Sequence, residues 1–404
     1  MAEQNILHIH QGKRPGNTFD LTPWSREAML RAQGYHATFP DYEFTPLDRL
    51  QNLAGYLGLG EVLVKDESKR FGLNAFKAVG GSYAMGKYIA RRLGRPLESL
   101  SYAAITSPEV KKSLGEITFV TATDGNHGRG VAWTAARLRQ KAVVLMPKGS
   151  SPERLGNIRA EGAEAHITDL NYDDTARQAR ALADKNGWVM IQDTTLENYE
   201  EIPGWIMQGY GTIAQETGEQ VAEAGLPAPT HVILQAGAGS FAGAMLACFA
   251  SLYPEALPRF IIVEPAAANC IFRTARAADG KLHFVTGEWS TIMAGLSVGE
   301  PCSIGWKIIE RYVDDYVSCA DNVAAKGMRV LGNPLGGDAR IISGESGAVP
   351  MGFLVETMTR PANQALRQSL GLDENSRVLC INTEGDTDRE QYRRIVWDGE
   401  YPNI

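Results

Sequence analysis

Cysteine is scarce in this sequence, and its spacing gives no sign of pairing or of metal binding. No Cys-x-x-Cys motif occurs, the number is odd, and the five residues are far apart: Cys248, Cys270, Cys302, Cys319 and Cys380. A disulfide framework, a zinc site and a redox-active pair are therefore not expected. The first thirteen residues also lack the basic start and apolar run of a signal peptide. The sequence thus predicts a reducing, cytoplasmic location without export.

The sequence also lacks an excess of positive charge and an uninterrupted hydrophobic run. Its 40 basic and 47 acidic residues give a net charge of -7, which offers no basis for binding nucleic acid or an anionic membrane. The stretch 232–253 is uncharged and long enough to cross a bilayer, but Gly237, Gly239 and Gly243 interrupt it. We expect a strand, a glycine turn and a helix there, and a small molecule as the partner.

The remaining composition is that of a soluble globular protein, with 44% hydrophobic and 22% charged residues. A chain of 404 residues is longer than a single hydrophobic core usually supports, so two domains are expected. Short β-branched runs alternate with helical segments, which predicts an α/β fold with open, twisted, mainly parallel sheets flanked by helices. The predicted strands are 62–64, 118–120, 142–145, 188–191, 232–234, 260–263 and 378–381, and helices are predicted at 130–139, 173–185 and 205–224.

The compact run of strands and helices over 118–199 looks like a small domain inserted into a larger one. The large domain would then consist of 1–117 and 200–404. In such folds ligands bind at the carboxyl ends of the strands, so we expect the active site in the cleft between the domains.

Lys77 is the only charged residue between Phe71 and Met85. Desolvation disfavours the charged form of an amine, so a lysine in such a window is suited to a Schiff base with an aldehyde cofactor such as pyridoxal phosphate. A solvated lysine at the start of a helix is the alternative, and for an isolated lysine it is the commoner case.

Two polar loops follow predicted strands. The first, Thr123-Asp124-Gly125-Asn126-His127-Gly128, offers hydroxyl, amide and backbone N–H groups for a carboxylate. An N-cap at Asp124 and a turn at Asn126 are the alternatives. The second runs from Gly237 to Gly243 and can hold a phosphate through backbone N–H groups and a helix N-terminus. By itself it fits a tight turn or a dinucleotide-binding loop as well.

In this order, Asn-x-Phe-Lys at 74–77, the Asp-Gly-Asn-His-Gly loop and the glycine loop resemble the tryptophan-synthase-β-like, or fold type II, pyridoxal-phosphate enzymes. Within that group, longer segments are similar to the diaminopropionate ammonia-lyases. These segments are 65–77, 123–129, 343–348 and 383–388, and the likeness extends from about Thr45 to Trp397.

The resemblance implies the following cofactor contacts. Lys77 carries pyridoxal 5'-phosphate as a Schiff base, and Asn126 bonds its phenolic oxygen. Thr383 lies where the group places a hydroxyl or thiol opposite the pyridine nitrogen, which weakens the ring as an electron sink and favours prompt β-elimination. Glu345 frames the ring or plays a structural role. The phosphate cup comprises Gly237, Ala238, Gly239, Ser240, Phe241 and Gly243, and no metal site is implied.

The resemblance also implies a reaction. Many dehydratases of this fold carry a small residue where Asp124 stands, so a carboxylate here is suited to act as a second base. Lys77 would take the α-proton of the L-substrate and Asp124 that of the D-substrate. Asp193 would bind the distal ammonium, unless it is a helix N-cap. Thr123 and His127 are further candidates for binding the substrate.

We therefore expect elimination of ammonia from D- and L-2,3-diaminopropionate, which gives pyruvate and two molecules of ammonia. A serine/threonine ammonia-lyase or D-cysteine desulfhydrase of the same fold is the nearest alternative. A non-catalytic carrier of pyridoxal phosphate is a second alternative. A nicotinamide-binding Rossmann protein is a third, but it relies on the glycine loop alone, because Glu264 follows the next strand while the triple-glycine spacing is wrong. Members of the group tend to be homodimers, so a homodimer is expected here.

Overall fold

The computed structural model describes residues 7–14, 19–123 and 125–402. Its contacts divide the chain into two compact units. Unit 1 comprises Met1–Asp20, Thr45–Lys69 and Thr217–Ile404, and unit 2 comprises Leu21–Phe44 and Arg70–Glu216.

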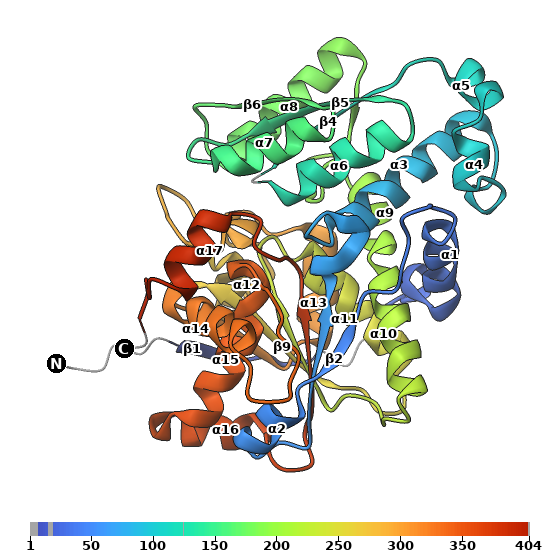
Figure 1. Ribbon diagram of the computed structural model, residues 1–404. Coiled ribbons are helices and arrows are strands. Elements are labelled where there is room, and N and C mark those ends of the chain that lie inside the picture. Colours follow the sequence, from blue (N-terminus) through green and yellow to red (C-terminus); the bar gives the residue numbers. More distant parts are fainter. Residues whose placement is uncertain (1–6, 15–18, 124, 403–404) are drawn as a thin grey trace. The chain divides into compact units, whose positions relative to one another are not determined.

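Unit 1 is built on a seven-stranded sheet (Figure 1). The strands lie in the order β1 (Leu7–Gln11), β10 (Asp315–Cys319), β9 (Arg259–Pro265), β8 (His231–Gln235), β11 (Arg377–Asn382), β3 (Glu61–Asp66) and β2 (Leu47–Arg49). The pairs from β10 to β3 are parallel, whereas β1 and β2 pair antiparallel at the two edges. All five parallel strands therefore end at the same edge of the sheet, where the glycine loop follows β8 and Thr383 follows β11.

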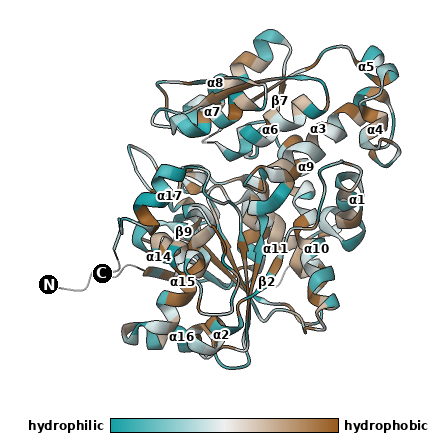
Figure 2. Ribbon diagram, in the orientation of Figure 1, coloured by the Kyte–Doolittle hydropathy of each residue, from teal (hydrophilic) through white to brown (hydrophobic). Residues whose placement is uncertain are grey.

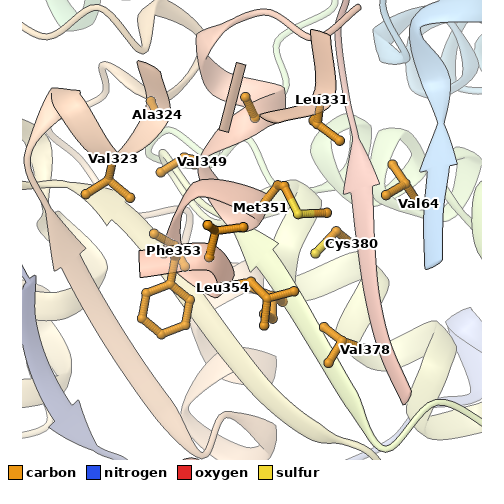
Figure 3. Packing of buried hydrophobic residues seen from close by; sticks show 14 of the residues in the cluster. Val64, Val323, Ala324, Leu331, Val349, Met351, Phe353, Leu354, Val378 and Cys380 are labelled. Carbon is orange, nitrogen blue, oxygen red and sulfur yellow. The ribbon is translucent and has the colours of Figure 1, made fainter. Parts of the chain in front are cut away.

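The core of unit 1 lies between this sheet and the helices α2 (Gln51–Leu57), α14 (Asp321–Gly332) and α15 (Glu345–Thr359). Alternate strand residues supply it, because successive side chains of a strand point to opposite faces. Figure 3 shows Val64, Val378 and Cys380 of the strands beside Met351 and Leu354 of α15. The unit also contains α11 (Ser240–Leu252), α12 (Cys270–Ala277), α13 (Ser303–Tyr312), α16 (Gln364–Leu370) and α17 (Arg389–Val396).

Unit 2 contains a parallel four-stranded sheet in the order β6 (Glu164–Ile167), β5 (Lys141–Met146), β4 (Thr118–Ala122) and β7 (Val189–Met190). The hydrophobic residues of β4 and β5 pack on the alanine face of α8 (Tyr172–Asn186). Figure 2 shows the strands as predominantly hydrophobic and α8 with a hydrophilic side. The unit's other helices are α1 (Arg26–His36), α3 (Lys77–Leu93), α4 (Tyr102–Ile105), α5 (Pro108–Leu114), α6 (Asn126–Arg137), α7 (Pro152–Ala160) and α9 (Glu201–Gly209).

The predicted fold class is confirmed, and each predicted strand contains or overlaps an observed one. The stretch 232–253 is strand, loop and helix as predicted, and none of the helices in the described ranges is long and apolar enough to cross a membrane. One predicted helix is wrong: 205–224 forms two helices, α9 and α10 (Gly211–Glu223), that meet at Tyr210. Hydrophobic residues continue across this junction, so the pattern alone does not reveal it.

The bounds of the compact units differ from the predicted domain division. The segment 118–199, predicted as the small domain, includes the whole four-stranded sheet. Unit 2 extends it with 21–44, 70–117 and 200–216, and within it α3 packs against both α6 and α9. Lys77 therefore belongs to the same unit as the 123–128 loop.

His36 links α3, the helix that begins with Lys77, to α10. Its ring is fully buried, with Nδ1 2.7 Å from the Thr212 hydroxyl of α10 and Nε2 2.9 Å from the Ser82 hydroxyl of α3. Burial lowers the pKa of His36 to about 3, and the positive charge of Arg70 acts in the same direction, against the opposing effect of Glu216.

This pKa predicts acid sensitivity. Between pH 6.5 and about 3 the unfolded chain binds a proton at His36 that the folded chain does not, so the free energy of unfolding falls as the pH falls through this range. The slope from one such group is about 1.4 kcal/mol per pH unit. His36→Gln should reduce the pH dependence of urea unfolding between pH 6 and pH 4. The exposed His166→Gln is the control, and equal slopes for both variants would contradict the prediction.

Candidate active site

Lys77 is the first residue of α3 and lies mostly inside the protein. The chain approaches it through two residues with left-handed backbone, Phe71 (φ 51°) and Asn74 (φ 59°), a conformation that is rare for an aromatic residue and commoner for asparagine. The Lys77 side chain is 19% exposed, and its Nζ forms an ion pair with Asp193. Nζ also lies 5.3 Å from the centre of the Phe76 ring. The amine is thus held by one carboxylate and one aromatic ring at the end of a buried helix, so it is not a freely solvated lysine.

Asp193 and His127 set the charge around this amine. Burial raises the pKa of the Asp193 carboxyl, but His127 and Lys77 lower it by more, and its pKa lies below the ordinary value. Burial lowers the pKa of His127 below its ordinary value. Both neighbours of Asp193 thus favour its carboxylate form. His127 Nε2 is 2.7 Å from the backbone carbonyl of Ile191, and Nδ1 is 3.8 Å from Asp193 Oδ2.

The 123–128 loop links β4 to α6, and a threonine hydroxyl holds its shape. Thr123 Oγ1 accepts hydrogen bonds from the backbone N–H groups of Gly125 (2.9 Å) and Gly128 (3.1 Å). Gly125 has a φ of 153° and caps α6, which begins at Asn126. Asp124 lies outside the described residues. The loop therefore ends at a helix N-terminus, where backbone N–H groups lack helical partners.

Close helix packing fixes this loop relative to Lys77 within unit 2. A Cβ atom on Gly130 of α6 would lie 2.9 Å from the backbone nitrogen of Ala78, the residue after Lys77. Only glycine fits so close an approach. The start of α6 and the start of α3 are consequently in direct backbone contact.

In unit 1, the glycine loop follows β8 and opens α11. Gly239 has a φ of 91° and caps the helix, which begins at Ser240. A Cβ on Gly237 would lie 3.0 Å from the Leu296 Cα, and one on Gly243 would lie 2.9 Å from the Gly305 Cα. Ala238 is held through its carbonyl, which accepts a 2.7 Å hydrogen bond from Cys302 N, and Phe241 is buried in the first turn of the helix. Backbone packing thus leaves the loop little freedom, as expected of a preformed anion site.

Thr383 follows β11 and is almost fully buried. Its Oγ1 accepts a 2.8 Å hydrogen bond from Gln235 Nε2, which also donates to the carbonyl of Ile381. Because the hydroxyl accepts from Gln235, its hydrogen is directed elsewhere and can be donated to a ring nitrogen. Glu345 is buried at the start of α15, whose backbone N–H at Ser346 donates to Glu384 Oε1.

A family model for pyridoxal-phosphate dependent enzymes matches residues 38–384. The chain belongs to this family. It is 53% identical to the diaminopropionate ammonia-lyase of Salmonella typhimurium, over 90% of this chain and 91% of the relative. A crystal structure of holo diaminopropionate ammonia lyase from Escherichia coli superposes with a TM-score of 0.91 and is 46% identical over 98% of both chains. Another structure of that enzyme, in complex with D-serine, has the same TM-score and 45% identity over 98% of both chains.

The family enzymes use pyridoxal 5'-phosphate, and this chain has the fold type II architecture. The residues present fit the cofactor. In unit 2, Lys77 is a shielded amine that could react with an aldehyde. In unit 1, the loop from Gly237 is a cradle that side chains would fill, and the Thr383 hydroxyl could donate to a ring nitrogen.

The structure rules against two of the alternatives left open by the sequence. Asp193 is not a helix N-cap, because no helix begins between Asp193 and Glu201 and its carboxylate binds Lys77. Glu264 is not available to bind the ribose of a nicotinamide cofactor, because it is fully buried and both of its oxygens accept backbone hydrogen bonds, from Ile271 and Phe272.

Two residues near the predicted site escaped the sequence analysis. Gln235 positions Thr383, and Glu384 binds the first turn of α15. A polar residue at the end of the apolar run 232–234 was the available signal for Gln235. The available signal for Glu384 was its position next to Thr383.

Thr123→Val should destabilise unit 2, because it leaves the N–H groups of Gly125 and Gly128 without their buried acceptor. We expect a loss of about 2 to 4 kcal/mol in the free energy of unfolding, measured by urea denaturation. Thr123→Ser keeps the oxygen and should lose much less. A valine variant as stable as the serine variant would show that the two hydrogen bonds contribute little.

Proposed function

We propose that this protein is a pyridoxal-phosphate-dependent carbon–nitrogen lyase that eliminates ammonia from D- and L-2,3-diaminopropionate, with a role in amino-acid catabolism. The observation that carries the proposal is the buried pair of Lys77 and Asp193, found in a chain 53% identical to a diaminopropionate ammonia-lyase. A carboxylate that binds an ammonium group inside the protein is what a substrate with a second amino group requires. Serine and threonine carry a hydroxyl at that position.

We assign the cofactor-binding residues as follows. Lys77 is the covalent attachment point, and Asn126 hydrogen-bonds the phenolic oxygen. Thr383 donates to the pyridine nitrogen, and Glu345 frames the ring. The phosphate is held by the loop of Gly237, Ala238, Gly239, Ser240, Phe241 and Gly243. The cofactor, when bound, withdraws electrons from the carbon that loses its proton.

The chain's own groups then move the protons. Lys77 Nζ removes the α-proton of the L-substrate, and the Asp124 carboxylate removes that of the D-substrate. Asp193 binds the distal ammonium, while Thr123 and His127 help to hold the substrate. The β-nitrogen leaves as ammonia, because a protonated amine is the better leaving group. Lys77 then releases aminoacrylate, which water converts to pyruvate and a second ammonia.

A homodimer in the cytoplasm is the assembly and location that we propose. Twofold dimers are the commonest closed assemblies, and all five cysteines are buried free thiols, as is usual where disulfides do not form. Light scattering of the purified protein tests the dimer, and a mass of 44.0 kDa, that of one chain, would contradict it.

Turnover of a substrate panel tests the proposed activity. Pyruvate formation should be far faster with D- and L-diaminopropionate than with serine, threonine or D-cysteine. Lys77→Ala should lose both this activity and the absorbance of the lysine-bound cofactor. Preferred turnover of threonine or D-cysteine would favour another β-eliminating enzyme, and cofactor binding without any pyruvate would favour a carrier.

Asp124→Asn should abolish turnover of D-diaminopropionate and spare much of the L-form, because only one of the two bases is removed. The measurement is kcat/KM for each enantiomer, with the exposed Asp169→Asn as the matched control. Equal losses for both enantiomers would refute the two-base assignment.

Asp193→Asn should change the substrate preference. Loss of a charge-assisted hydrogen bond costs about 1.5 to 3 kcal/mol, so kcat/KM for diaminopropionate should fall about 10- to 100-fold more than that for serine. The variant also alters the surroundings of Lys77, which affects both substrates, and the ratio between them removes this shared effect. Asp184→Asn, at an exposed site, is the control and should leave the ratio of kcat/KM for diaminopropionate to that for serine unchanged. An unchanged ratio in Asp193→Asn would show that Asp193 does not bind the second ammonium.

A further inference from the structure

Glu264 is a buried carboxyl group that the proposed mechanism does not use. It is the next-to-last residue of β9 and is fully inaccessible to solvent. Oε1 accepts a 2.9 Å hydrogen bond from Ile271 N, and Oε2 accepts a 2.6 Å hydrogen bond from Phe272 N. Burial raises the pKa of Glu264 well above its ordinary value, and the two N–H groups act in the opposite direction. The carboxyl group therefore ties the end of β9 to the first turn of α12.

That first turn lies directly against the glycine loop. The Cys270 thiol is 3.6 Å from the carbonyl oxygen of Gly237, within hydrogen-bonding distance for sulfur. A Cβ on Gly239 would lie 3.0 Å from Ile271 Cδ1. Two consecutive residues of α12 thus touch two glycines of the loop, and one of them donates its backbone N–H to Glu264.

Other walls of the loop do not depend on Glu264, and one of them is the Ile309 side chain of α13, whose Cδ1 would lie 2.8 Å from a Cβ on Gly239. Leu296 packs against Gly237, Gly305 packs against Gly243, and Cys302 N donates to the carbonyl of Ala238. The contact with α12 differs, because the Glu264 side chain at the end of β9 sets the position of α12. A change at Glu264 can therefore shift the loop without removing any residue that forms it.

We propose that Glu264 is a positioning residue for the phosphate of the cofactor. By fixing Cys270 and Ile271 it sets the direction of the backbone N–H groups between Gly237 and Ser240, and so the preference for phosphorylated over unphosphorylated pyridoxal. This inference rests on the proposed role of the glycine loop as the phosphate site.

The test compares binding of pyridoxal phosphate and of pyridoxal to the apoenzyme. Glu264→Gln retains the shape but brings an N–H₂ group against a backbone N–H, and Glu264→Leu removes both acceptors. The dissociation constant of pyridoxal phosphate should rise about tenfold in the glutamine variant and more in the leucine variant. The dissociation constant of pyridoxal should change less than about threefold, because pyridoxal has no phosphate group for the loop to bind. Absorbance of the lysine-bound cofactor reports both constants without any turnover.

Two further variants keep the test decisive. Glu356→Gln alters another buried carboxylate of unit 1, which pairs with Lys326 and Arg360, and should leave the ratio of the two constants unchanged. Ile271→Ala removes the contact with Gly239 while Glu264 stays intact. It should raise the dissociation constant of pyridoxal phosphate relative to that of pyridoxal, and it provides the test if the leucine variant does not fold.

Equal weakening of both ligands by the Glu264 variants would show a merely structural role and overturn the inference. A wild-type protein that binds pyridoxal as tightly as pyridoxal phosphate would instead overturn the assignment of the glycine loop. The two failures are thus distinguishable by the wild-type measurement alone.

Discussion

The ion pair between Lys77 and Asp193 is the interaction on which the chemistry of unit 2 depends. A mostly buried ammonium requires a nearby negative charge, and a buried carboxylate requires a positive one. The two groups supply each other's counter-charge, and burial lowers the pKa of the adjacent His127. In the proposed reaction, Lys77 would be engaged with the cofactor and Asp193 would face the substrate instead. The resting contact and the proposed contact with a substrate ammonium are thus the same electrostatic arrangement with a different cation.

The architecture around this pair shows how precisely a few backbone contacts place it. Helix α3 begins at Lys77, and α6 begins just after the 123–128 loop. The absence of a side chain at Gly130 lets the two helices touch next to Lys77. His36 ties α3 to α10. The glycine loop in unit 1 is confined in a comparable way, by backbone packing at Gly237 and Gly243. Both units therefore place their functional groups through rigid elements, which is what a preorganised site needs.

Much of this could be predicted from the sequence because the relevant signals are local. The apolar runs that form the central strands are unmistakable, and each polar loop directly follows one of them. The edge strands β1, β2 and β6 and the inner strand β10 were not predicted, because they carry charged or polar residues within short stretches. The break at Tyr210 was missed for the opposite reason, since hydrophobicity continues through it. Gln235 and Glu384 act through partners distant in sequence, Thr383 being 148 positions from Gln235, and no local pattern reveals such pairs.

The hydrogen bond from Gln235 to Thr383 has a direction, and that direction matters. An amide nitrogen can only give a hydrogen, so the threonine oxygen must receive it and point its own hydrogen onward. A carboxylate at position 235 would reverse this relay, because it can only receive. The threonine would then present lone pairs and would prefer a protonated ring nitrogen, the state that stabilises a carbanion. With Thr383 facing the ring nitrogen as proposed, the identity of one side chain that never meets the substrate would help to decide whether a bound amino acid is broken down or merely inverted.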